Sequence, residues 1–412
     1  MRFFYLKIIF LLFSLALLQP VFGQFYYSVS AEREYNTNPF RLKDGEADQT
    51  SELGFGVRKD WNNISAQYYG NYLLFNSNAP RNFYWHQFYL NGGDTLNWFL
   101  SADNRINRDD YEVYNYFTLK GGLNSLASSG SYLFRYGGSA AYNNYELLPE
   151  LNNLMFNAFI SMNRSFQTRT SIIGAISFNF KNYLNDNPSE EIIAADDNSD
   201  ISSLLLKDSG NGRGGGNGSG HGDGNPGSGG GPGGGNSGFY YSQESASSTV
   251  TQLLLSFRAA QSITSKTGLA LQYFNRISLN DKDRGIAGLL EGYDTESQIF
   301  DDPMGYEGET IGAVFTWILP WSSMFKASAY YLDKNYISQG IYAGADNYDE
   351  NILRSDIRKT VYLVLQKKFD INLFESGSIT FFVNYRWMEN ESNSYWYDYN
   401  NQSVSAGIDL DF

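Results

Sequence analysis

The stretch Ser403-Val404-Ser405-Ala406-Gly407-Ile408-Asp409-Leu410-Asp411-Phe412 determines how the whole sequence is interpreted. Every second residue from Val404 to Phe412 is apolar, and the residues between them are small or acidic. Successive side chains of a β-strand point to opposite sides, so this alternation predicts a strand with one apolar and one polar face.

The same alternation recurs throughout the chain. About sixteen segments show it, each long enough to cross a bilayer at a tilt; a count two higher or lower stays open. They begin near Phe25, Thr50, Ile64, Asn82, Leu96, Glu112, Tyr132, Leu154, Thr170, Thr249, Thr267, Thr310, Met324, Asp356, Ser378 and Tyr397.

The connections between these segments are of two kinds. Every second link is a short turn, as at residues 60–63, 92–95, 164–167 and 320–323, and several of the others are long and polar, as at 36–48, 185–248, 280–308 and 335–355. This layout predicts an all-β fold over residues 24–412: a transmembrane antiparallel up-and-down β-barrel with short periplasmic turns and long extracellular loops. A soluble β-sandwich also shows alternation, but the strand number, the strand length and the unequal loops favour the barrel.

The first 23 residues resemble a secretory signal peptide. Arg2 and Lys7 precede an apolar run from Ile8 to Leu18, and small residues end at Gly23, where we expect cleavage. The run is too short for a membrane span, although an N-terminal anchor is the alternative reading. Export and the absence of cysteine indicate a protein of the bacterial outer membrane in contact with its lipid.

Composition excludes several functions. Without cysteine the chain has no thiolate metal site or thiol nucleophile, and a net charge of −14 argues against nucleic acid as a partner. Of two histidines, His86 lies on an aromatic segment and His221 in a glycine-rich run. Two histidines far apart in sequence argue against a zinc site and against a catalytic triad. The segment Asp281-Lys282-Asp283-Arg284-Gly285 lacks ligands that a calcium loop needs. We therefore expect no catalytic residue, metal or cofactor.

Residues 209–238 contain 17 glycines among 30 residues. Such a run cannot bury enough surface to fold, so residues 185–248 are predicted to be a flexible extracellular loop. A phosphate-binding loop is rejected because no βαβ unit surrounds it. The nearby acidic residues from Glu190 to Asp200 are read as solvated charge, with loose divalent-cation binding as the minor alternative.

Charged residues recur on the polar phase of the predicted strands. They could pair across strands and hold the lumen in shape, or they could set a transverse field that selects solutes by charge; both readings stay open. The candidate pore-lining residues are Arg58, Asp103, Arg105, Arg135, Arg258, Arg276, Arg358, Arg386 and Asp409.

The C-terminal segment resembles the last strand of bacterial outer-membrane β-barrel proteins of the porin type. The resemblance implies that Val404, Ala406, Ile408, Leu410 and Phe412 form the signal read by the barrel-assembly machinery. More loosely, residues 35–40 and 392–399 resemble segments of barrels associated with surface polysaccharide. Trimers are common in porins, so a homo-oligomer stays open.

Three functions follow from this sequence. The leading one is a porin-like channel for passive or weakly selective passage of small hydrophilic solutes. The alternative is a barrel that serves as conduit or anchor for surface polysaccharide or a secreted partner. An enzyme is third, and the scarcity of histidine argues against it.

Overall fold

The computed structural model describes residues 25–185, 240–241, 248–281, 286–287, 301–345, 347–371 and 377–412. The expected signal peptide, most of the glycine-rich loop with His221, and residues 282–285 lie outside this part. No helix within it is long and apolar enough to cross a membrane.

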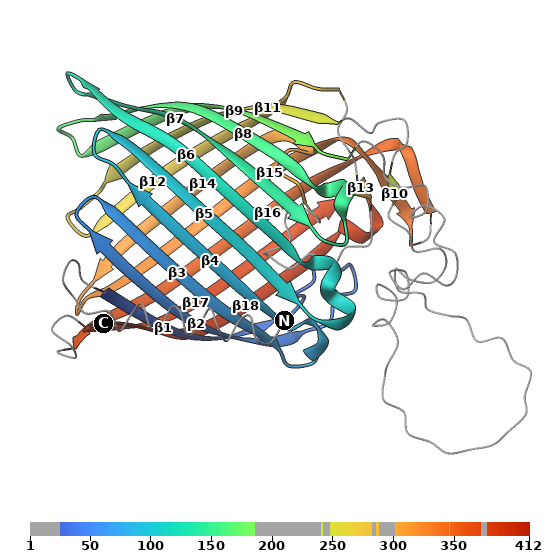
Figure 1. Ribbon diagram of the computed structural model, residues 1–412, viewed down its shortest axis with the longest axis horizontal. Coiled ribbons are helices and arrows are strands. Elements are labelled where there is room, and N and C mark those ends of the chain that lie inside the picture. Colours follow the sequence, from blue (N-terminus) through green and yellow to red (C-terminus); the bar gives the residue numbers. More distant parts are fainter. Residues whose placement is uncertain are drawn as a thin grey trace, which may run out of the picture.

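The chain forms a closed antiparallel barrel of sixteen strands, as predicted (Figure 1). Neighbours in sequence pair in turn, and β1 pairs with β18 to close the sheet, with Tyr35 opposite Val404. Closure leaves no unpaired edge, which a sheet in hydrocarbon requires. The strands are β1 (Phe25–Asn36), β2 (Asp48–Trp61), β3 (Ile64–Phe75), β4 (Phe83–Gly92), β5 (Leu96–Asn107), β6 (Tyr116–Ser129), β7 (Tyr132–Tyr145), β8 (Asn153–Ser165), β9 (Thr170–Tyr183), β11 (Thr249–Ser262), β12 (Thr267–Ser278), β14 (Tyr306–Leu319), β15 (Ser323–Gly344), β16 (Asn347–Ile371), β17 (Gly377–Ser392) and β18 (Tyr399–Asp411).

The outer face of the barrel is apolar. Leu53, Phe55, Val383 and Val404 are each about half exposed, with relative exposures between 47% and 53%. In water such exposure would favour aggregation, whereas in a bilayer it faces acyl chains. Together with the closed sixteen-stranded sheet, this is the architecture of a transmembrane up-and-down β-barrel.

The two ends of the barrel differ as expected. The short turns gather at the end that carries the C-terminus, and the long connections gather at the other (Figure 1). Tight turns demand unusual backbone: Gly93 has φ +106, and an added Cβ would strike the carbonyl of Leu96. Trp321 and Ser322 adopt φ +57 and +56 in another turn, a conformation that side chains rarely accept.

Residues 335–355 were expected to be a long polar loop, and this prediction was wrong. β15 and β16 continue through them as a hairpin beyond the barrel wall, with register shifts on either side of Gly340. Ser338, Gln339 and Arg354 of this extension are buried, and the Tyr348 hydroxyl accepts a hydrogen bond from the Gly340 amide at 3.0 Å. β16 therefore begins nine residues before the predicted Asp356.

Several other starts differ by a few residues. β6 begins at Tyr116 rather than Glu112 because the residues before it form a short 3-10 helix, η2 (Asp109–Tyr114). Three more 3-10 turns lie in the long connections: η1 (Ala79–Arg81), η3 (Pro149–Leu151) and η5 (Tyr395–Tyr397). A two-stranded sheet pairs β10 (Tyr240–Tyr241) with β13 (Ile286–Ala287).

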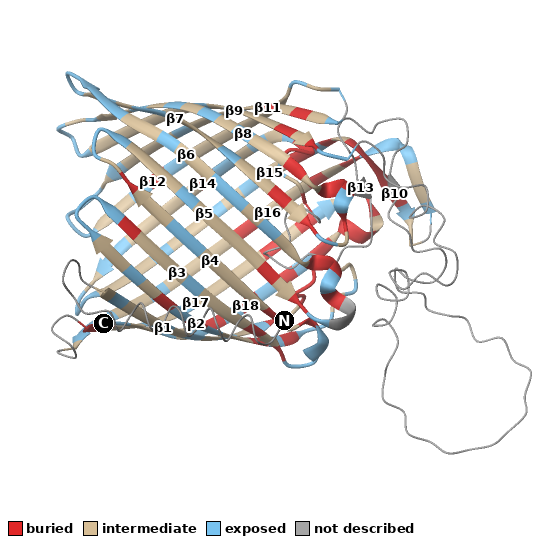
Figure 2. Cartoon of the chain, in the orientation of Figure 1, coloured by how far each residue is buried: buried red, intermediate tan, exposed pale blue. Residues whose placement is uncertain are grey.

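Buried residues concentrate at the loop end of the barrel (Figure 2). The largest apolar cluster, which we call the mouth core, joins side chains from strands and loops on opposite sides of the ring. Its members are Tyr111, Val113, Tyr114, Tyr145, Leu148, Leu151, Tyr342, Met388, Trp396, Tyr397 and Tyr399. The described loops thus pack against one another across the extracellular mouth.

Candidate functional site

The inner wall is defined by the strand register. Directly paired residues of an antiparallel ladder lie on the same face, so one face can be followed around the barrel. The row Asp409–Ser30–Gly54–Asn71–Trp85–Arg105 is continuous from β18 to β5. By this register the side chains of all nine predicted pore-lining residues lie on the inner face of the barrel. That they line a conducting pore stays a prediction.

Some of these inward charges have partners. Arg58 pairs with Asp60 at 2.9 Å on the same strand. Asp103 accepts hydrogen bonds from the Trp85 indole at 2.6 Å and from the Gln87 amide at 3.3 Å. These contacts fix the carboxylate in place against the wall, which supports the structural reading of the inner charges for this part of the ring.

Arg105 does not contact the open lumen. Its side chain is 3% exposed, and the guanidinium lies 3.9 Å from the Phe83 ring centroid and 5.7 Å from that of Tyr114. Tyr114 belongs to η2, which covers the inner end of β5. Arg105 therefore holds a loop onto the wall.

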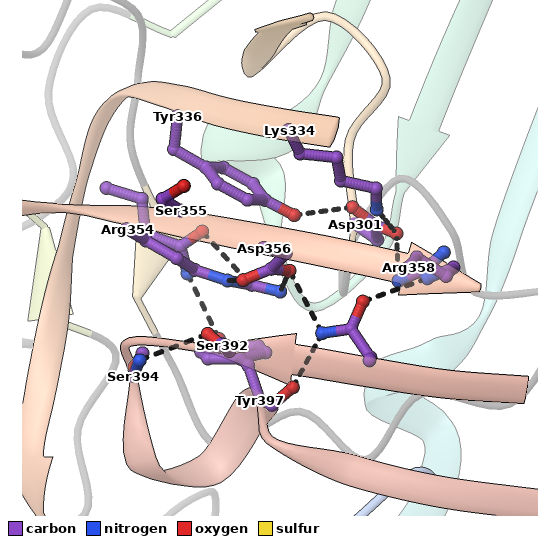
Figure 3. Close-up of polar contacts among 12 residues, drawn as sticks. Asp301, Lys334, Tyr336, Arg354, Ser355, Asp356, Arg358, Ser392, Ser394 and Tyr397 are labelled. Carbon is purple, nitrogen blue, oxygen red and sulfur yellow. Dashed lines mark hydrogen bonds and ion pairs between the residues drawn. The ribbon is translucent and has the colours of Figure 1, made fainter. Parts of the chain in front are cut away.

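The densest group of charges lies at the mouth, where β15 and β16 rise above the barrel (Figure 3). Asp301 accepts hydrogen bonds from Lys334 and from the Tyr336 hydroxyl, the latter at 2.7 Å, and it pairs with Arg358 at 2.9 Å. Burial alone would raise the pKa of the Asp301 carboxyl, but the charges of Lys334, Arg358 and Arg354 outweigh burial and hold this pKa well below its usual range. The carboxylate is a fixed anion in this site.

Arg354 and Asp356 form a second, fully buried pair beside the first. The guanidinium reaches Asp356 with two nitrogens, one of them at 2.9 Å. It is also enclosed between the rings of Tyr336 and Tyr397, at 4.2 and 3.4 Å from their centroids. Two stacked rings and a bidentate partner offset the cost of removing both charges from water.

Asn390 of β17 joins these two ion pairs. It accepts from Arg358 at 3.0 Å, and its amide donates to Asp356 at 3.2 Å and to the Tyr397 carbonyl at 2.6 Å. All of its polar groups are thereby used, and its side chain is completely buried. The cluster is one connected network, so a change at one member will be felt at the others.

Asp301 belongs to a short segment, residues 301–305, which we call the strap. Asp302 forms an ion pair with Lys181 of β9. Gln252 of β11 donates to the Pro303 carbonyl at 3.0 Å, and Met304 packs on Tyr183 and Val250. The strap therefore crosses the inner side of the wall from β15 and β16 to β9.

A separate recess lies deeper, between β16 and β2. It has a volume of about 360 Å³, and no Lys or Arg of the described residues pairs with its carboxylates. We call it the lumenal recess. It is lined by Ser30, Glu32, Glu52, Val364, Gln366, Thr380, Phe382, Asn384 and Asp409.

His86 points away from the lumen. By register it shares the outer face with Tyr68 and Tyr84, and its Nδ1 lies 2.8 Å from the Tyr68 hydroxyl. Its ring is stacked between those two tyrosines, with centroids 6.2 and 6.4 Å away. This is the environment of an interfacial aromatic belt, where amphipathic rings meet the lipid headgroups.

In the described part of the chain, no three His, Asp or Glu side chains gather closely enough to hold a metal ion. The C-terminal strand carries its apolar residues on the outer face, and Phe412 stacks on Tyr27 of β1 at 5.7 Å. Its recognition by the assembly machinery stays a prediction.

Sequence reasoning missed most of the mouth cluster. It selected Arg358, but Asp301, Lys334, Arg354 and Asp356 were assigned to loops or left out. One signal was present: the spacing Arg354-x-Asp356-x-Arg358 is the alternation of a strand with charges on one face. Nothing in the sequence places residue 301 beside them.

Comparison with known proteins adds a likeness of fold. The sequence matches no protein-family model and no curated protein. Among solved structures, OccAB1 of Acinetobacter baumannii has a TM-score of 0.49 at 7% identity over 95% of this chain and 97% of its own. OpdK of Pseudomonas aeruginosa, solved with vanillate, has a TM-score of 0.46 at 6% identity over 94% and 99%. A loop-deletion form of OmpT from Vibrio cholerae has 0.43 at 9% identity over 95% and 99%. What the site does is therefore argued from the chain's own residues.

Proposed function

We propose that the chain is an outer-membrane channel for small hydrophilic solutes, exported with cleavage near Gly23 and inserted by the barrel-assembly machinery. The observation that carries this proposal is the closed sixteen-stranded ladder with an apolar outer face and a charged inner one. A barrel of this size encloses a space wide enough for water and small solutes.

The charges of the inner wall support weak selectivity. Glu32, Glu52 and Asp409 lie on β1, β2 and β18, whereas Arg135 and Arg258 lie on β7 and β11, on the other side of the ring in strand order. Opposed charges set a transverse field across the lumen, which orients dipolar solutes. The contacts of Arg58, Arg105 and Asp103 support the structural reading at their part of the wall, and the proposal assigns the two readings to different parts of the wall.

A second function has one observation in its favour. The mouth core brings described loops from opposite sides of the ring together at the extracellular end, and the strap is bound to the wall beside it; this arrangement suits a barrel that opens only when a polysaccharide or a secreted partner engages its loops. Such a conduit or anchor would conduct little by itself.

Planar-bilayer recording on the refolded protein tests the proposal. We expect discrete conductance steps, with ion selectivity measured from the reversal potential in a salt gradient. A folded barrel that stays silent under all voltages would contradict the channel and favour the conduit or anchor.

A further inference from the structure

The lumenal recess owes its shape to small residues. Gly407 lies in the row Phe382–Gly407–Glu32–Glu52, and Ser30 and Gly54 lie in the row Asp409–Ser30–Gly54 beside it. These small residues leave space between Phe382 and the carboxylates, and the surface is hollowed here. The hollow of about 360 Å³ lies at the low end of the range for small-molecule sites.

One wall of the recess is an aromatic ring that lies against the sheet. A Cβ added at Gly407 would strike the Cζ and Cε1 atoms of Phe382, so the ring extends across the glycine and does not point into the lumen. Such a ring offers a flat apolar surface to a solute. Tyr69 lies in the same way over Gly56 on the far side of the recess.

Polar groups surround this ring. Seven of the nine lining residues carry a hydroxyl, an amide or a carboxylate. Ser30, Thr380, Gln366 and Asn384 supply both donors and acceptors, and the three carboxylates supply acceptors only. A solute that fills the recess must therefore present several hydroxyl donors at its edge and an apolar face to Phe382.

The carboxylates of the recess lack the basic partners that several other acids of the barrel have. Asp60, Asp301 and Asp356 are each paired with a basic side chain. Glu32 and Glu52 face each other directly across β1 and β2, and no ion pair joins either to a basic residue of the described chain. Two like charges opposite each other on paired strands destabilise the fold. The carboxylates therefore remain available as hydrogen-bond acceptors for a ligand, and they would repel an anionic solute.

We propose that the lumenal recess binds one ring of a neutral sugar. The pyranose has a flat face of C–H groups for Phe382 and a rim of hydroxyls for the carboxylates and amides. This proposal rests on the proposed channel function, because the sugar would bind on its way through the lumen. A protonated amine is the competing ligand, and it would bind the carboxylates without using the four neutral polar groups.

The test is a titration of the refolded full chain in a planar bilayer with D-glucose, with sorbitol as a polyol that lacks a preformed ring. We expect glucose to reduce the conductance saturably and sorbitol to act only through viscosity. Phe382→Ala should weaken the glucose effect about five-fold, as expected for loss of a stacked ring. Phe99→Ala, which removes a ring lying over Gly122 outside the recess, should leave it unchanged.

The carboxylates separate sugar from cation. The triple variant Glu32→Gln, Glu52→Gln and Asp409→Asn keeps hydrogen-bonding groups of the same shape, so glucose affinity should fall only about two- to five-fold. Saturable block by spermidine that vanishes in this variant, with no saturable effect of glucose on the parent protein, would overturn the proposal in favour of an amine site.

Calorimetric titration of the same refolded proteins with glucose distinguishes failure of the inference from failure of the channel. Glucose binding that depends on Phe382 in a barrel that never conducts would keep the recess and reject the channel. Conductance without Phe382-dependent glucose binding would keep the channel and reject the recess.

Discussion

Arg358 of β16 and Asp301 of the strap form an ion pair of 2.9 Å in which the side chains are only 12% and 7% exposed. Asp301 lies in the connection between β12 and β14, whereas Arg358 lies on a strand of the wall, and their contact holds the strap against the wall. Lys334 and Tyr336 bind the same carboxylate. The described loops at the mouth are therefore held by charge as well as by the aromatic packing of the mouth core.

Asp301→Asn should release the strap. Removing one charge leaves Lys334 and Arg358 buried beside a neutral amide, a change that costs about 3–5 kcal/mol when a buried pair is broken. We expect a larger single-channel conductance and faster protease cleavage near residue 301. Glu389→Gln, which alters an exposed outer-face pair with Lys359, serves as control and should change neither.

Acidification should also release the strap and raise the conductance, but only below a defined pH. The pKa of Asp301 is lowered well below its usual range on folding, whereas the unfolded carboxyl titrates near pH 4, at about 3.9. The contribution of this group to stability is therefore complete above that pH and is lost as the pH falls through the folded value. Conductance recorded from pH 7 downwards should stay constant to about pH 4 and rise only below it. A rise that is complete by pH 5 would show that another group controls closure.

Trp396→Ala should loosen the mouth core without unfolding the barrel. The Trp396 indole donates to the Ala345 carbonyl at 2.9 Å, and the side chain is 8% exposed. Loss of a buried tryptophan side chain destabilises a packed core by about 3–5 kcal/mol. Here we expect the packing of the loops, and not the strands, to be destabilised. Near-UV circular dichroism should show loop melting at a lower temperature, while the far-UV signal of the strands keeps its midpoint. Trp321→Ala, at a turn where the side chain is 82% exposed, is the matched control.

Gly407→Ala should narrow the lumen. The new methyl group would occupy the position of the Phe382 ring, which must swing inward. We expect a lower conductance and a destabilisation of about 1–3 kcal/mol, measured by urea unfolding from lipid vesicles. Gly174→Ala, whose added Cβ meets nothing within 4 Å, should match the parent protein, and an equal drop there would contradict the argument.

Phe412→Ala should slow insertion in the presence of the barrel-assembly machinery. The residue also stacks on Tyr27 at 5.7 Å, so a packing defect needs separate measurement. Tyr27→Ala removes the same contact and leaves the C-terminal signal intact. If recognition is the role of Phe412, machinery-assisted insertion falls only in the first variant, while spontaneous refolding in detergent responds equally in both.

The barrel could be predicted because the sequence pattern of each strand is local. Alternation of apolar and polar residues fixes a strand and its two faces without knowledge of distant contacts, and most strand starts lie within four residues of the prediction. The long start error, at β16, arose where residues such as Arg354 and Asp356 are polar yet fully buried. A polar stretch of sequence indicates a loop. Burial of these polar side chains is stable only because partners across the mouth form hydrogen bonds and ion pairs with them.

The candidate site was harder to predict for the same reason. The inward phase of Arg358 and Asp409 follows from their strands. The pairing of Arg358 with Asp301 depends on the path of a loop. The alternation of apolar and polar residues does not predict the path of a loop. The recess depends on Gly407 and Asp409 of β18 lying beside Glu32 and Ser30 of β1, a match of register between the two ends of the chain.

The strap has a mechanical consequence. Two consecutive residues, Asp301 and Asp302, bind basic groups on β15 and β16 at one end and on β9 at the other. A sheet closed by backbone hydrogen bonds alone can flatten toward an ellipse under lateral pressure from the bilayer. A tether across several strands resists that change of cross-section, so we expect the strap to stiffen this part of the barrel wall.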